Sequence, residues 1–163
     1  MPESWRTRLF RWRINLFPAY RGTGGRVTYI RHDWMEVRVT VPLSWRTRNY
    51  VGSIFGGSLY GAVDPVYMLM LIKCLGPEYV VWDKSATIRF KRPGRTRLFA
   101  TFRLDAPMLE EIRRELGRLP KLDRQFTIDL TDPAGTVYAR IEKTIHLSRR
   151  AAVERAGAPV GPG

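Results

Sequence analysis

A pair of glycines and an aspartate seven positions later are the residues of this chain whose types and spacing suit chemistry. Gly56 and Gly57 directly precede a stretch, 58–75, that is predicted to be helical. Glycines at a helix start leave backbone amides uncovered, and the amides of the first turn have no partner within the helix. With the helix dipole behind them, these donors suit an oxygen atom that gains negative charge during a reaction. Asp64 follows Gly57 by about two turns, so both are expected on one face of the helix.

The same residues also have purely structural interpretations. Gly57 and Gly61 form a GxxxG spacing, which lets strands pack close to a helix. Asp64 precedes Pro65, and this pair favours the start of a helix that the carboxylate would merely cap. Alternatively the helix continues and Pro65 bends it, because the proline ring clashes with the carbonyl of Gly61. The sequence leaves these alternatives open.

The helix that carries Asp64 is predicted to be the centre of the fold. It is apolar nearly all round as far as Lys73, which indicates a buried helix, and it ends at Gly76 and Pro77. Its longest apolar run, 66–72, is far shorter than the roughly 20 residues that span a bilayer, so we expect no transmembrane segment.

Alternating apolar residues predict strands on both sides of this helix. The expected elements are two strands within 27–41 joined near 32–33, a hairpin of 79–92 and 96–104 with its turn at 93–94, a short helix at 109–119, and a hairpin of 126–130 and 137–147 with its turn at 132–135. The class is therefore α+β, with an antiparallel sheet of about six strands wrapped around one long buried helix.

The two ends of the chain add a helix and a tail. Residues 3–17 predict an amphipathic helix with Ser4 as its N-cap, and with a stripe of large apolar residues between arginines: Trp5, Leu9, Trp12 and Leu16. We expect this helix to pack across the sheet or against a partner subunit. The chain thus reads as one domain over 1–147, followed by a tail, 148–163, that we expect to be disordered.

The composition narrows the classes of function. A single cysteine among 163 residues excludes internal disulfides and favours a reducing compartment, so we expect a cytoplasmic protein. Arginines interrupt the apolar residues of the N-terminus too often for a signal peptide. Two histidines and one cysteine leave little material for a metal site, and we expect none.

The net charge of +13, from 28 basic and 15 acidic residues, attracts polyanions such as nucleic acid, anionic lipid or phosphorylated cofactors. It can equally reflect a solvated basic surface. The segment 5–13 alternates aromatic residues with arginines, which makes a nucleic-acid or membrane-surface binder an alternative function. We expect no specific nucleic-acid partner.

The segment 49–64 resembles the hotdog-fold thioesterases, in particular the phenylacetyl-CoA type and a related family of uncharacterised hotdog domains. Those proteins carry an asparagine, then His-Gly-Gly at the start of the core helix, and an acidic residue seven positions after the second glycine. Here the matching residues are Asn49, Phe55-Gly56-Gly57 and Asp64. The strand over 86–94, which ends in an Arg-Pro step, is similar to the family as well.

The resemblance implies a hotdog fold and an acyl-CoA thioesterase. By analogy, the Gly57 amide would stabilise the oxyanion, Asp64 would act as general base or nucleophile, and Asn49 would orient the thioester or the water. Phe55 departs from the family's histidine and removes a polar group from the mouth of the site. The alternative is therefore a non-catalytic hotdog protein that binds an acyl thioester or a lipid.

The substrate and the partners follow from the same resemblance. The residues expected to bind the acyl group, unless they only pack the core, are Phe55, Gly56, Tyr60, Tyr67 and Met68. The residues expected to hold the phosphates of coenzyme A, unless they only form a solvated hairpin tip, are Arg89, Lys91, Arg92 and Arg95. Coenzyme A would enter as part of the substrate, with no separate cofactor. Because a sheet around one helix leaves an edge strand exposed, we expect a homodimer or a dimer of dimers.

Overall fold

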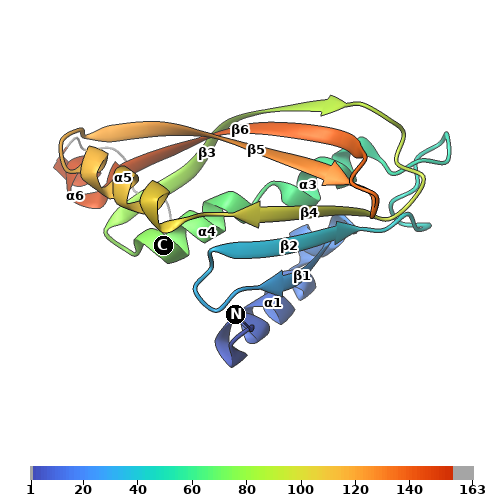
Figure 1. The fold of residues 1–163 in the computed structure, drawn as a ribbon, viewed down its shortest axis with the longest axis horizontal. Coiled ribbons are helices and arrows are strands. Elements are labelled where there is room, and N and C mark those ends of the chain that lie inside the picture. The colour runs from blue at the N-terminus through green and yellow to red at the C-terminus, as the bar shows by residue number, and fades with distance from the viewer. Residues whose placement is uncertain (1, 156–163) are drawn as a thin grey trace.

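A computed structural model describes residues 2–155, which form a six-stranded antiparallel sheet with a helical pair against one face (Figure 1). The strand order is β1-β2-β4-β5-β6-β3. The strands are β1 (Arg26–Ile30), β2 (Glu36–Val41), β3 (Tyr79–Phe90), β4 (Leu98–Arg103), β5 (Lys121–Thr131) and β6 (Val137–Arg149). The helices are α1 (Trp5–Leu16), α2 (Pro18–Gly22), α3 (Gly56–Val63), α4 (Val66–Leu75), α5 (Ala106–Leu116) and α6 (Arg150–Arg155).

The central helix continues through Asp64 and Pro65 from α3 into α4. Both residues have helical backbone angles, with φ −50° and ψ −54° at Asp64 and φ −78° and ψ −7° at Pro65. No side chain caps the start of α4. The interpretation in which the helix runs on and Pro65 interrupts its hydrogen bonds is therefore confirmed, and the one in which the Asp64 carboxylate caps a new helix is wrong.

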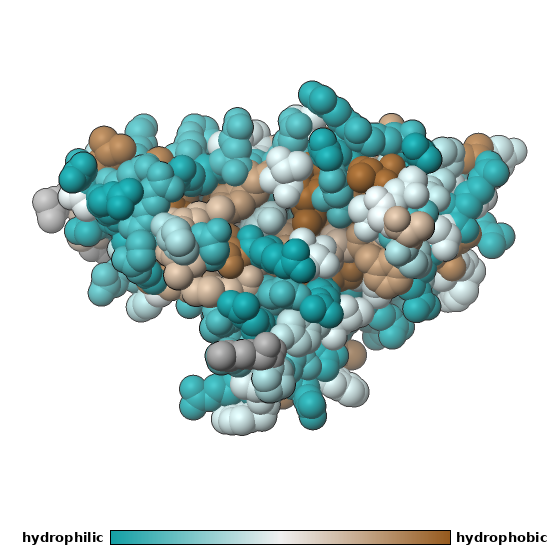
Figure 2. Space-filling view, viewed as in Figure 1, coloured by the Kyte–Doolittle hydropathy of each residue, from teal (hydrophilic) through white to brown (hydrophobic). Residues whose placement is uncertain are grey.

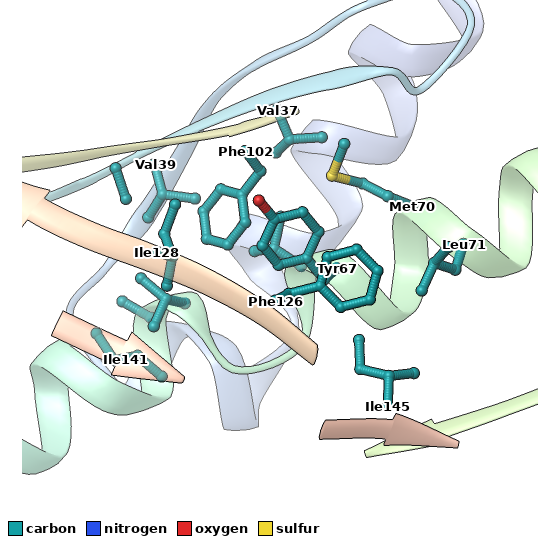
Figure 3. Close-up of a cluster of buried hydrophobic side chains, with 14 of the residues drawn as sticks. Val37, Val39, Tyr67, Met70, Leu71, Phe102, Phe126, Ile128, Ile141 and Ile145 are labelled. Atoms are coloured by element: carbon teal, nitrogen blue, oxygen red, sulfur yellow. The ribbon is translucent and has the colours of Figure 1, made fainter. Parts of the chain in front are cut away.

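The core lies between this helix and the sheet (Figure 3). Met70 and Leu71 of α4 are fully buried, and the strands contribute Phe102, Ile141 and Ile145. The segment Gly56–Leu75 is 20 residues long and apolar enough to cross a membrane by length and composition, but half of its most apolar window is buried inside the protein. Packing against the sheet makes it a core helix, and core helices pass the same test.

The expected hairpin of 79–92 and 96–104 is wrong. β3 pairs with β6 from Tyr79 opposite Arg149 to Phe90 opposite Ala139, whereas β4 lies between β2 and β5. A seven-residue connection leads away from β3 instead of turning back, and Ile54 N–H donates to its Gly94 carbonyl at 2.8 Å. The second expected hairpin, β5 and β6, is confirmed.

Helix α5 begins three residues before the predicted start at 109. Asp105 caps it, because its Oδ1 accepts a hydrogen bond from Met108 N–H at 2.8 Å. The short helix α2 begins at Pro18, directly after α1, and was not predicted. At the other end, β6 reaches Arg149 and α6 follows, so the disorder expected over 148–163 does not hold for 148–155; residues 156–163 lie outside the described range.

Helix α1 packs against the sheet through a face other than the predicted one. Thr7 is buried, and Phe10 and Ile14 pack against the core. Side chains on this inner side fix the helix to β1: the Asn15 amide group donates to the Val27 carbonyl at 2.8 Å and accepts from its N–H at 2.9 Å, and Ile30 N–H donates to Glu3 at 3.1 Å. The predicted apolar stripe therefore points away from the core.

The two edges of the sheet differ in whether their outward backbone groups are hydrogen-bonded. Asn15 and Glu3 occupy backbone groups of β1 that face away from β2. β3, on the opposite edge, pairs with β6 on one side only and is 12 residues long. A long unpaired edge is a template for another strand.

Candidate active site

The start of α3 presents two amides that have no partner among the described residues. Its first backbone hydrogen bonds run from Ser58 and Leu59 to the carbonyl of Phe55, at 3.0 and 3.2 Å. The amides of Gly56 and Gly57 precede these bonds and donate none within residues 2–155. The uncovered donors expected from the sequence are therefore present at the positive end of the helix dipole.

Two phenyl rings lie directly against these glycines. A Cβ atom added at Gly56 would lie 2.8 Å from Phe90 Cζ, and one added at Gly57 would lie 2.4 Å from Phe55 Cε1. Phe55 and Phe90 are 58% and 57% exposed, so the rings form an open apolar rim. A larger residue at either position would have to displace the exposed ring that lies against it. Gly61, one turn on, instead makes room for the Thr23 side chain.

Asp64 is held through one carboxylate oxygen. Tyr60 Oη donates to its Oδ1 at 2.7 Å, and Lys143 Nζ donates to the same atom at 2.8 Å and also to the Asp64 carbonyl. Oδ2 accepts no hydrogen bond from any described residue, and 40% of the side chain is exposed. The result is an oriented carboxylate with one oxygen available to solvent.

Lys143 comes from β6 and is fully buried. Its ammonium group also pairs with Asp83 Oδ2 on β3 at 2.8 Å, while the buried Oδ1 of Asp83 has no partner among the described residues. Sequence reasoning missed both residues. The alternation of buried and exposed residues along β6 could have revealed Lys143. It lies between Ile141 and Ile145 on the face that points to the core.

Burial shifts the pKa values of Asp83 and Tyr60, the two neighbours of Lys143 and Asp64. Loss of solvent raises the pKa of Asp83 above its ordinary value; Lys143 counteracts the rise and Asp64 adds to it. Burial and the Asp64 carboxylate also raise the pKa of Tyr60. The Tyr60 phenol therefore keeps its proton and remains a donor to Asp64 at neutral pH.

The raised pKa of Asp83 predicts a pH dependence of stability. The folded protein binds the Asp83 proton more tightly than the unfolded chain, so this group's contribution to the free energy of unfolding falls as pH rises through the raised pKa. Asp83→Asn removes that contribution. As pH rises from about 4, the ordinary carboxyl range, urea unfolding should show the wild type losing stability relative to Asp83→Asn. A difference independent of pH would contradict the assignment.

Asn49 makes local hydrogen bonds in the loop before the helix start. Its Oδ1 accepts from the N–H groups of Val51 and Ser53 at 3.1 and 2.9 Å, and its Nδ2 donates to Ser53 Oγ at 2.9 Å. These bonds shape the loop that leads to Gly56. We therefore leave Asn49 out of the reacting groups.

The residues predicted to bind an acyl group have different surroundings. Tyr67 lies in the core between the rings of Phe102 and Phe126, with centroids 5.0 and 4.6 Å away (Figure 3). Tyr60 orients Asp64, Met68 is half-buried, and Phe55 lies at the rim of the helix start. Tyr67 is therefore a packing residue in this subunit, which was the alternative left open.

An apolar cavity that the sequence did not reveal adjoins Asp64. It measures about 560 Å³ and lies between α1, α2 and the bend of the central helix. Its apolar walls include Phe10, Ile14, Phe17, Tyr20 and Leu69. Gly61 and Asp64 form part of the wall, so the face of α3 that carries Asp64 opens onto this cavity.

The basic cluster lies at the end of β3 and in the loop that follows. The side chains of Arg89, Lys91, Arg92 and Arg95 are exposed. Two contacts place this segment beside the helix start: the Phe90 ring lies against Gly56, and Gly94 accepts from Ile54 N–H. The segment that carries the basic cluster therefore passes beside the helix start.

Comparison with known families gives one match over most of the chain. Residues 6–147 match the family described as a domain of unknown function, DUF4442. The chain belongs to the DUF4442 family. Comparison of this DUF4442 protein with curated sequences gives no match.

Solved structures similar to the DUF4442 chain include several described as thioesterases. A Pseudomonas aeruginosa protein of unknown function, described as a probable thioesterase, aligns over 92% of this chain and 99% of its own, with a TM-score of 0.80 and 24% identity. A thioesterase from Haemophilus influenzae aligns over 90% and 93%, with a TM-score of 0.65 and 14% identity. A mutant Pseudomonas aeruginosa thioesterase aligns over 78% and 83%, with a TM-score of 0.57 and 15% identity. The hotdog fold expected from residues 49–64 is confirmed.

Proposed function

We propose that the protein hydrolyses an acyl-CoA thioester, with Asp64 activating water and the Gly57 amide stabilising the oxyanion. The observation that carries this proposal is the pairing of two unpartnered amides at the start of α3 with a carboxylate two turns later. That carboxylate is fixed by Tyr60 and Lys143 but keeps one oxygen open. The thioesterase descriptions of structural neighbours support the same reaction class.

In this reaction, Asp64 Oδ2 takes a proton from a water molecule whose oxygen attacks the thioester carbonyl carbon. The carbonyl oxygen becomes negative and receives hydrogen bonds from the amides at the helix start. The C–S bond then breaks, the acid forms, and the proton passes to the leaving thiolate of coenzyme A. Lys143 holds Asp64 in place and does not touch the substrate.

The surroundings of Asp64 suggest where the two halves of the substrate bind. The cavity of about 560 Å³ suits an acyl or aryl group, because its walls are mostly apolar and Asp64 faces it. Arg92 and Arg95, with their basic neighbours beside Gly56, suit the phosphates of coenzyme A.

Phe55 favours a second candidate, a protein that binds an acyl thioester without cleaving it. Its ring lies against Gly57, at the position where the thioesterases that the segment 49–64 resembles carry a histidine. Such a protein would bind acyl-CoA and unfold at a higher temperature in its presence, but would release no free thiol.

The deciding experiment measures thiol release from a panel of acyl-CoAs, from acetyl to palmitoyl and aromatic. Each acyl group is also presented as its N-acetylcysteamine thioester, which has the same reacting bond without the phosphates. We expect hydrolysis of some acyl-CoAs and a higher KM for the truncated thioesters. Thermal stabilisation without thiol release would favour the binding protein, and neither effect would reject both.

We infer further that β3 pairs with the same strand of a second copy. β3 is the open edge of the sheet, and its Phe90 and Asp83 belong to the surroundings of the site. Pairing would satisfy the unpaired edge of β3 and would bring two sites close to one interface.

The dimer can be tested on the outer face of β3. Ser85 and Thr87 lie opposite Thr144 and Glu142, and they alternate with the inward-facing Ala86. The double variant Ser85→Lys and Thr87→Lys places like charges on the pairing edge without entering the core, so we expect a monomer by light scattering. Thr127→Lys, on the exposed face of β5, is the matched control and should leave the mass unchanged. A persistent dimer in the double variant would exclude pairing through β3.

A further inference from the structure

The outer face of α1 carries large apolar side chains in full contact with solvent. Trp5, Leu9, Trp12 and Leu16 are 71, 53, 61 and 57% exposed. Their spacing of four, three and four residues aligns them in one narrow stripe along the helix. Phe10 and Ile14 pack inward on the opposite side of α1, and Asn15 and Glu3 bond to β1. The stripe therefore cannot turn inward without breaking these contacts.

Arginines border this stripe on both sides. At 100° per residue, Arg8 lies on one flank, and Arg6 and Arg13 lie on the other. Between Glu3 and Asp33 the chain has seven arginines and no acidic residue, and Glu3 itself is neutralised by Arg11 at 2.7 Å. In Figure 2, strongly hydrophilic residues lie beside paler ones on the lower projection that α1 forms in Figure 1.

A basic cavity extends the same surface. It measures about 550 Å³, and Trp12 and Leu16 of α1 form one of its walls. Trp45, which is 87% exposed, stands on the loop after β2. The arginines that line the cavity are Arg11, Arg21, Arg26 and Arg46. A cavity with several guanidinium groups and indole rings at its rim suits a phosphate attached to an apolar body.

We propose that this surface, the outer stripe of α1 with the adjoining arginine-lined cavity, binds the anionic phospholipid surface of a membrane. Tryptophan prefers the boundary between headgroups and acyl chains, and each nearby arginine gains from the negative surface potential. The stripe would enter the headgroup region while the arginines contact phosphates.

Charge argues against the other partners for this surface. A two-fold contact between copies of the chain would set the arginines of one stripe against those of the other, with no carboxylate on the face to pair with them. Nucleic acid would satisfy the arginines, but it would leave Leu9 and Leu16 exposed.

The test measures sedimentation of the full chain with vesicles of phosphatidylcholine, alone or mixed with phosphatidylglycerol. We expect binding to the mixed vesicles only, with a blue shift of tryptophan fluorescence. Trp5→Ser with Trp12→Ser should weaken binding about tenfold or more and abolish most of the shift. Equal binding by wild type and this variant would overturn the proposal.

A pair of matched variants separates the surface from overall charge. Arg6→Glu with Arg13→Glu and Arg114→Glu with Arg118→Glu change the net charge equally, but the second pair lies on and just after α5, far along the chain from α1. We expect loss of vesicle binding for the first pair alone. Equal loss would show that net charge suffices and would overturn the assignment to α1. Tighter binding to duplex DNA than to the mixed vesicles, or a Trp5/Trp12-dependent dimer without vesicle binding, would overturn it as well.

Discussion

Asp64→Asn is expected to lower the rate of acyl-CoA hydrolysis by about 10²–10⁴-fold, the range that a positioned general base contributes. Asparagine has nearly the same shape, and its carbonyl oxygen can still accept from Tyr60 and Lys143. The substitution therefore removes the basic oxygen while keeping its geometry. The measurement is kcat for the best acyl-CoA of the panel, with circular dichroism to establish folding.

Asp129→Asn is the matched control for this variant. Asp129 is also held by a basic side chain, Arg140 at 2.7 Å, but it lies on β5 and outside the central helix. The control should keep the wild-type rate. A rate of Asp64→Asn within a factor of a few of wild type would remove Asp64 from the mechanism, whatever substrate is used.

Lys143→Met is expected to lower the free energy of unfolding by about 3 kcal/mol, because it leaves the buried side of two carboxylates without a counter-charge. Asp83 bears most of this cost, since 22% of its side chain is exposed against 40% for Asp64. Urea denaturation monitored by fluorescence gives the value. Adding Asp83→Asn should restore part of the loss, because the pair is directly coupled.

Lys84→Met provides the comparison with Lys143→Met. It removes a lysine of β3 whose ion pair lies at the surface. Lys84 binds Asp123 at 2.5 Å, but its side chain is 56% exposed, so its loss should barely move the unfolding midpoint. Similar losses of stability in Lys84→Met and Lys143→Met would show that the buried ion pairs of Lys143 stabilise the fold no more than a surface ion pair does.

The central helix, the glycines at its start and Asp64 could be predicted from the sequence, because they depend on local signals. Apolar residues on all sides, the glycines at 56 and 57 and the Gly-Pro stop each act within a few residues. The sequence around Asp64 was compatible with two conformations, a continuous helix or a new helix capped by the carboxylate. In the structure the carboxylate accepts hydrogen bonds from Lys143 and Tyr60 and does not cap a helix.

What could not be predicted depends on partners distant in the sequence. β3 and β4 are neighbours along the chain, yet β3 pairs with β6 and thereby brings Asp83 to Lys143. The stripe of α1 looked like a core face because four large apolar residues outweigh Thr7, Phe10 and Ile14 in any pattern. The orientation of α1 depends on distant contacts, namely the packing of Phe10 and Ile14 on the core and the hydrogen bonds of Asn15 and Glu3 to β1.

Those same hydrogen bonds limit how many copies can join strand to strand. With the β1 edge occupied by Asn15 and Glu3, each chain offers a single free edge, β3, and so has a valence of one in this mode of assembly. Two such chains complete each other and leave no edge for a third, so growth into an extended ribbon stops at the pair. Any larger oligomer would need a different kind of surface, such as the outer face of the sheet.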